Sequence, residues 1–163
     1  MNPILFIEAN IGGGKSTFAK KMTELKQSRN KELKQASYLD NITVLLEPVD
    51  EWVKTVDSDK VNILQHYYSD PNKYSFAFQM NSFISRCHKL MKHRDSEMIH
   101  TIIMERSIFS DYYCFAQNCY ENGTMTEIEF VIYKKWFHWL TESFSIKSHG
   151  FIYIKTDPEE CYE

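Results

Sequence analysis

The sequence predicts an α/β fold with a doubly wound parallel sheet flanked by helices. Short apolar runs rich in β-branched residues alternate with longer amphipathic stretches. Runs of this kind are typical of strands buried on both faces. The predicted strands span residues 3–8, 43–47, 101–105 and 151–155. Because consecutive parallel strands need a crossover connection, their alternation with helices favours one parallel sheet.

Helices are predicted where apolar residues recur every three or four positions. The clearest helix runs from Tyr74 to about Arg94 and has one broad apolar side. The predicted helices span residues 17–26, 61–68, 74–94, 110–120 and 126–144. No linker or repeat interrupts the pattern, and 163 residues suffice for a sizeable core. We therefore expect a single domain over residues 1–163.

Composition and charge exclude several classes of protein. A hydrophobic fraction of 43% and an aromatic fraction of 15% indicate a packed globule. The net charge of −3, with basic residues spread among acidic ones, argues against a nucleic-acid duplex as partner. No apolar run approaches the ~18 residues of a membrane span, and we expect no leader ahead of the first strand. We expect a cytoplasmic protein with free thiols and no zinc site, since its cysteines and histidines lack metal-ligand spacing.

A glycine-rich loop after the first strand carries the strongest functional signal. Residues 9–17 read Ala-Asn-Ile-Gly-Gly-Gly-Lys-Ser-Thr and lead into a helix, the arrangement of a phosphate-binding loop, or P-loop. The fold is therefore expected to be of the P-loop NTPase type. Lys15 adds a positive charge and the Ser16 hydroxyl suits Mg²⁺, while Ala9 replaces the motif's first glycine and requires a negative φ. The predicted ATP phosphate-binding residues are Asn10, Ile11, Gly12, Gly13, Gly14, Lys15, Ser16 and Thr17.

Charged residues occur where the predicted strands end. Glu8 ends the first predicted strand and Glu47 ends the second. Glu105 ends the third, and Arg106 follows it directly. Ligands of doubly wound sheets bind beyond the carboxyl ends of the strands, where the P-loop also lies. These carboxylates and the arginine are therefore candidates for a shared site, with Glu8 in a structural role.

These residues resemble the motifs of the deoxynucleoside kinase family, which includes deoxycytidine, deoxyguanosine and mitochondrial thymidine kinases. The resemblance covers essentially all 163 residues, and the motifs occur in the family's order. They are the P-loop at 10–17, Glu-Pro-Val at 47–49 with Trp52, Leu-Gln at 64–65 with Tyr68, Ser-Phe-Ala-Phe-Gln at 75–79, Ser-Arg at 85–86, Glu-Arg-Ser at 105–107 with Ser-Asp at 110–111, and Thr-Asp-Pro-Glu-Glu-Cys at 156–161.

The resemblance implies ATP-dependent phosphorylation of the 5′-hydroxyl of a deoxynucleoside in nucleotide salvage, with Mg²⁺ as cofactor and ATP or another nucleoside triphosphate as donor. The implied catalytic residues are Glu47, Arg106 and Lys15. Glu47 would act as the general base that removes the proton of the 5′-hydroxyl. Arg106 would hold Glu47 and the transferred phosphoryl group. Ser16 would bind Mg²⁺, and Glu105 would bind it through water in place of a Walker B aspartate.

The resemblance also assigns residues to the nucleoside. Tyr68 would donate to the 3′-hydroxyl, Gln79 would read the base edge with two hydrogen bonds, and Phe78 with Phe115 would clamp the base. The implied substrate-binding residues are Glu47, Trp52, Tyr68, Phe78, Gln79, Ser82, Arg86, Arg106, Asp111 and Phe115.

Arg86 and Asp111 bear on the choice of base. In the family this combination goes with deoxycytidine and purine deoxynucleosides, so we expect these substrates in preference to thymidine. Ser82 resembles the residue at the corresponding position of the family members that prefer deoxyguanosine. A structural alternative stays open for both charged pairs, namely that Arg86 with Asp111, and Arg106 with Glu47, only neutralise each other.

Family members are usually homodimers built from the helices that correspond to residues 74–94 and 126–144. The second helix carries Trp136 and Trp139 among more apolar groups than one buried stripe needs. A homodimer is therefore expected, although a deeper core explains the same residues.

The chain ends soon after residues 156–161, ahead of the arginine-rich lid and the last strand of the family. We accordingly expect a P-loop kinase domain that is incomplete at its C-terminus, with one edge of strand 151–155 unpaired and nucleotide binding stronger than turnover. Two alternatives stay open at this point. One is a nucleotide-binding protein with weak or no catalysis, and the other is a nucleoside monophosphate kinase.

Overall fold

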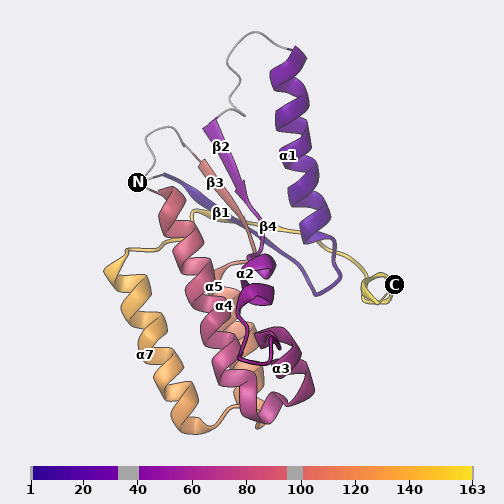
Figure 1. Cartoon of the computed structure of the whole chain (residues 1–163). Coiled ribbons are helices and arrows are strands. Elements are labelled where there is room, and N and C mark those ends of the chain that lie inside the picture. Colours follow the sequence, from indigo (N-terminus) through magenta and orange to yellow (C-terminus); the bar gives the residue numbers. More distant parts are fainter. Residues whose placement is uncertain (1, 33–40, 95–100, 163) are drawn as a thin grey trace. The chain divides into compact units, whose positions relative to one another are not determined.

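A four-stranded, all-parallel sheet organises the chain in the computed structural model, which describes residues 2–32, 41–94 and 101–162 (Figure 1). The strands are β1 (Ile4–Glu8), β2 (Ile42–Leu45), β3 (Thr101–Glu105) and β4 (Gly150–Tyr153). Their order in the sheet is β2-β3-β1-β4. This confirms the predicted α/β fold with a parallel sheet. β3 has the predicted bounds, whereas β2 ends two residues early, before the Glu47-Pro48 pair.

The chain divides into two compact units. The sheet unit comprises residues 1–47, 89–107 and 147–163, and the helical unit comprises residues 48–88 and 108–146. The chain therefore passes from the sheet unit into the helical unit directly after Glu47 and again directly after Ser107. The expected single domain over residues 1–163 stays a prediction.

The core of the sheet unit lies between the strands and α1 (Lys15–Glu32). Ile7, Ala19 and Ile103 are buried together, because β1 and β3 carry apolar residues on both faces. α1 is longer than the predicted helix over residues 17–26. Apolar periodicity fades beyond residue 26, but the strong helix formers that follow continue the helix without it.

The helical unit contains helices α2 (Val49–Lys54), α3 (Ile63–Ser69) and α7 (Glu127–Ser143), and most of α4 (Pro71–Arg94). Capping boxes begin two of them: Asn62 pairs with Gln65 at α3, and Thr126 pairs with Glu129 at α7. α2 was not predicted, since six residues are too few to show a helical period. Aromatic rings fill the unit, with Phe83 5.6 Å from Phe137 between ring centroids.

The helix predicted over residues 110–120 is confirmed as helical, but it is not a single α-helix. The structure divides this stretch into α5 (Ile108–Ser110), a π-helical segment η2 (Asp111–Ala116) and α6 (Gln117–Glu121). A π-helix has more residues per turn, which a search for 3.6-residue periodicity does not detect. Such segments are frequent at functional sites.

Two further findings complete the description. The sheet unit includes the 3₁₀ turn η3 (Glu159–Cys161). Among the described residues, none of the helices is long and apolar enough to cross a membrane.

Candidate active site

The P-loop connects β1 to α1 and depends on its glycines. Gly12 has a φ of 77° and Gly14 a φ of 83°, which side chains rarely tolerate. A Cβ atom on Gly13 would lie 2.9 Å from that of Ala9 and 3.0 Å from the Asn10 carbonyl oxygen. Ala9 is not among the residues with positive φ, so alanine is compatible with the first position of the motif.

Lys15 is buried inside this loop. Its Nζ donates to the carbonyl oxygens of Ala9 at 3.2 Å and Asn10 at 2.7 Å. Burial lowers the pKa of Lys15, and the positive charge of Arg106 lowers it further, while nearby glutamates oppose the shift. A cation that burial destabilises is well placed to gain from a phosphate group in the loop.

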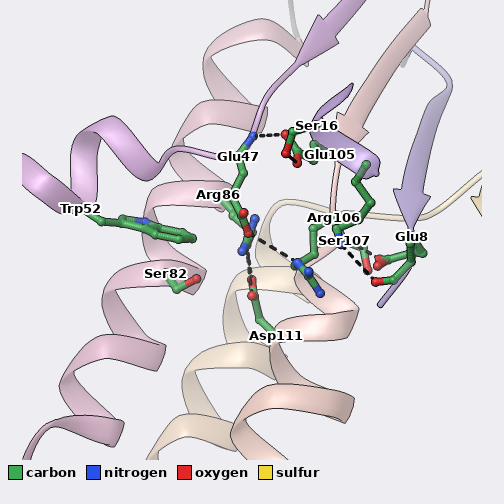
Figure 2. A network of polar contacts seen from close by, with 12 residues as sticks. Glu8, Ser16, Glu47, Trp52, Ser82, Arg86, Glu105, Arg106, Ser107 and Asp111 are labelled. Atoms are coloured by element: carbon green, nitrogen blue, oxygen red, sulfur yellow. Dashed lines mark hydrogen bonds and ion pairs between the residues drawn. The ribbon is translucent and has the colours of Figure 1, made fainter. Parts of the chain in front are cut away.

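The carboxylate of Glu105 connects three parts of the sheet unit (Figure 2). One oxygen accepts a hydrogen bond from the Ser16 hydroxyl at the start of α1. The other accepts from the backbone N–H of Glu47, beyond β2, at 3.1 Å. Because Glu105 is buried and ends β3, it fixes the P-loop hydroxyl and the segment of Glu47 relative to the same strand.

Arg106 adopts a left-handed backbone conformation, with a φ of 64°. Two hydrogen bonds hold it: its own N–H donates to the Ile7 carbonyl at 2.9 Å, and the N–H of Ser107 donates to the Glu8 carboxylate at 2.8 Å. The Nε of Arg106 lies 3.4 Å from the Glu47 carboxylate. Glu8 thus supports an energetically costly backbone conformation at the arginine that pairs with Glu47.

A cavity of about 270 Å³ opens among these groups. All three predicted catalytic residues and both predicted metal ligands line it, together with most of the P-loop. The lining residues are Ile11, Gly12, Gly14, Lys15, Ser16, Thr17, Glu47, Glu105 and Arg106. The cavity combines cations suited to phosphate with a carboxylate able to accept a proton.

The Ser16 hydroxyl and the Glu105 carboxylate are hard oxygen donors of the kind that Mg²⁺ prefers. In the part of the chain that the structure describes, no group of three His, Cys, Asp or Glu residues could hold a metal ion. These two donors therefore fit an ion that takes its remaining ligands from phosphates and water.

The helical unit contains the predicted base-binding residues. The Trp52 Nε1 donates to the Ser85 hydroxyl at 2.8 Å, and its ring meets Phe78 edge-on at a centroid distance of 5.5 Å. The Arg86 guanidinium lies 5.2 Å from the Trp52 ring centroid. Its Nε lies 2.9 and 3.0 Å from the two carboxylate oxygens of Asp111 (Figure 2). This ion pair is almost completely buried, so each charge depends on the other.

The remaining predicted residues differ in burial. Gln79 and Ser82 are buried and Phe115 is partly buried. Tyr68 is 77% exposed, whereas its neighbour Tyr67 stacks on Phe78 at 4.6 Å. Among the predicted nucleoside-binding residues, Tyr68 is thus the one that the structure leaves exposed.

Several residues with defined contacts here were not predicted for the site: Tyr67, Ser85, Ser107 and Cys119. Ser107 belongs to the Glu-Arg-Ser motif, which is a usable signal. Ser85 likewise belongs to the Ser-Arg motif at 85–86, whereas the sequence offers no comparable signal for Cys119, since its importance arises from partners far along the chain.

Comparison with known proteins gives a consistent result. The family model "Deoxynucleoside kinase" matches residues 5–163. The chain is 34% identical to mouse deoxycytidine kinase and 32% identical to the human enzyme, over 95% of this chain and 62% of each relative. It is 32% identical to mitochondrial deoxyguanosine kinase of Xenopus laevis, over 98% of this chain and 61% of that protein. The chain thus spans about three fifths of the length of these relatives.

The contact between Glu8 and Ser107 leads to a first prediction. Glu8→Ala should lower the free energy of unfolding by about 1–3 kcal/mol, because it removes the carboxylate that accepts a hydrogen bond from the Ser107 N–H. Glu8→Gln keeps an acceptor oxygen and should lose less than half as much. Urea denaturation measures both, with Glu24→Ala on the exposed side of α1 as the control. Equal losses in the Ala and Gln variants would contradict the assigned role.

Proposed function

The chain belongs to the deoxynucleoside kinase family, and we propose that it transfers the γ-phosphoryl group of ATP to the 5′-hydroxyl of a deoxynucleoside. One observation carries the proposal: the Glu47 carboxylate and the P-loop Lys15 line the same cavity. A base for an alcohol and a cation for phosphates are the two functions that this reaction requires. The product would serve nucleotide salvage.

In this reaction the 5′-oxygen forms a bond to the γ-phosphorus while the bond to the β-phosphate oxygen breaks. The proton of the hydroxyl passes to the Glu47 carboxylate, and ADP leaves. Arg106, whose Nε lies 3.4 Å from the Glu47 carboxylate, holds this carboxylate in its orientation. The same guanidinium and Lys15 stabilise the charge on the transferred group.

The phosphate donor is assigned to the P-loop, whose positive φ values at Gly12 and Gly14 turn the backbone as an oxyanion cradle requires. Ser16 and Glu105 are proposed to hold Mg²⁺. Bound there, the ion would neutralise phosphate charge.

Recognition of the nucleoside is assigned to the helical unit. Trp52, Phe78 and Phe115 offer aromatic surface for the base, and the buried Gln79 offers an amide for its edge. Tyr68 for the 3′-hydroxyl and Ser82 beside the base stay predictions. Deoxycytidine or a purine deoxynucleoside is the proposed substrate; the Arg86–Asp111 pair and the names of the relatives support this choice.

We also infer a homodimer that uses α7. Ile128, Ile132, Trp136 and Trp139 are exposed at positions that share one side of this helix. The opposite side is apolar as well and is buried, through Phe130, Tyr133 and Phe137. A helix with apolar residues on both sides is expected to cover the exposed side with a partner.

A radiolabelled-phosphate transfer assay tests the reaction. The chain should phosphorylate deoxynucleosides, with deoxycytidine or a purine deoxynucleoside above thymidine, and should not phosphorylate deoxynucleoside monophosphates. Glu47→Gln should lower the rate by about 10²–10⁴-fold, because the general base is lost. ATP affinity, measured by calorimetry, should be nearly unchanged in this variant.

Glu51→Gln, an exposed carboxylate on α2, serves as the control and should retain the wild-type rate. The proposal is refuted by a wild-type chain that transfers no phosphate to any deoxynucleoside, or by a Glu47→Gln variant as active as the wild type. Thymidine as the best substrate would refute the base preference alone.

Sedimentation equilibrium tests the dimer. The wild-type chain should sediment as a dimer and Trp136→Glu as a monomer, because a buried glutamate has no partner in the interface. Val53→Glu changes an exposed apolar residue of α2, away from the stripe, and should leave the dimer intact. A monomeric wild-type chain would contradict the inference.

A further inference from the structure

We propose that Cys119 is a positioning residue that fixes the orientation of the Gln79 side-chain amide, and thereby determines which class of base edge the chain accepts. The inference rests on the proposed function, which assigns Gln79 to the base. It extends that function to a residue that takes no part in the chemistry.

The first observation is a buried contact. The Gln79 Nε2 donates to the Cys119 Sγ at 3.7 Å, and the two residues are 2% and 4% exposed. Sulfur is a weak hydrogen-bond acceptor. Among the hydrogen bonds that the structure describes for Gln79, it is nevertheless the atom that accepts from the amide nitrogen. Burial makes this contact more significant, since water does not compete for the same N–H.

The second observation is the other neighbour of the thiol. The Tyr67 hydroxyl lies 4.0 Å from the Cys119 Sγ. When the thiol hydrogen points to the Tyr67 oxygen, the sulfur lone pairs stay available to accept a hydrogen bond from the Gln79 amide. Burial raises the pKa of Tyr67 to about 12, so its phenol stays protonated at neutral pH. In this arrangement the thiol presents only an acceptor to Gln79. The amide nitrogen can donate to it, whereas the amide oxygen at the same place would find no donor.

The third observation is that the Cys119 backbone and the Tyr67 ring are each held by further contacts. The carbonyl oxygen of Cys119 accepts hydrogen bonds from the N–H groups of Thr124 and Met125 at 2.9 and 3.0 Å, and from the Thr124 hydroxyl at 3.1 Å. On the other side, Tyr67 is held by its stacking on Phe78. The backbone that carries the thiol and the ring that contacts it are therefore both fixed, as the support of a positioning group must be.

A fixed amide presents its donor and its acceptor in one order. Cytosine and adenine pair an acceptor ring nitrogen with an exocyclic amine, whereas guanine and thymine pair a ring N–H with a carbonyl. One amide orientation matches one class, while an amide free to rotate by half a turn serves both. Cys119 would therefore produce discrimination between the two classes, which a purely apolar neighbour could not.

Calorimetric titration of the full chain with the four deoxynucleosides tests this inference without requiring turnover. In the wild type, the deoxycytidine and deoxyadenosine affinities should differ from those for deoxyguanosine and thymidine by about tenfold or more, the effect of one mismatched hydrogen bond. Cys119→Ala and Cys119→Val should reduce this ratio to about threefold or less. Cys119→Ser, which keeps an acceptor and a donor, should retain it.

The affinities in each ratio are measured on the same variant. A general loss of stability therefore affects all four nucleosides and leaves their ratio unchanged. Cys114→Ala, an exposed cysteine of η2, should behave as the wild type. An unchanged ratio in Cys119→Ala and Cys119→Val, or affinities for all four nucleosides that fall equally, would overturn the inference and leave the proposed function intact. A wild-type chain that binds no deoxynucleoside would overturn both.

Discussion

The sheet unit is organised around the carboxylate of Glu105. Its two oxygens accept from the Ser16 hydroxyl and from the Glu47 backbone N–H, so one buried charge joins the P-loop to the strand end that bears the proposed base. A buried carboxylate without such partners would be strongly destabilising. The hydrogen bonds that satisfy Glu105 are thus the ones that place Glu47 in the cavity of Lys15.

The two charged pairs proposed for the site lie one in each unit, and their environments differ. Arg106 and Glu47 line a cavity, where water and ligands can reach them. Arg86 and Asp111 are almost completely buried, so that removing one partner would leave a costly charge. The first pair is suited to chemistry and the second to shaping a site. The chain changes unit directly after Glu47 and after Ser107, so along the sequence the proposed catalytic residues lead directly into segments of the unit proposed for recognition.

Local signals predicted much of this architecture. The apolar runs gave β3 its bounds, and the glycines and Lys15 identified the P-loop, because these features depend on neighbours in the sequence. The π-helical η2 was missed since its turn departs from the usual period. Positive φ at Arg106, the bonds that support it from Ile7 and Glu8, and the thiol contact of Gln79 arise from residues far along the chain. No local pattern encodes them.

The most direct test of this account is the rate of phosphoryl transfer by Glu105→Gln at saturating ATP, Mg²⁺ and deoxynucleoside. The amide keeps the shape of Glu105 but cannot accept at both positions: with its oxygen on the Glu47 N–H, its nitrogen must donate to Ser16, which reverses that hydrogen bond and removes the negative charge beside the P-loop. The account predicts a rate at least about 10²-fold below that of the wild type. A rate within about threefold of the wild type would contradict the claim that this carboxylate organises the site.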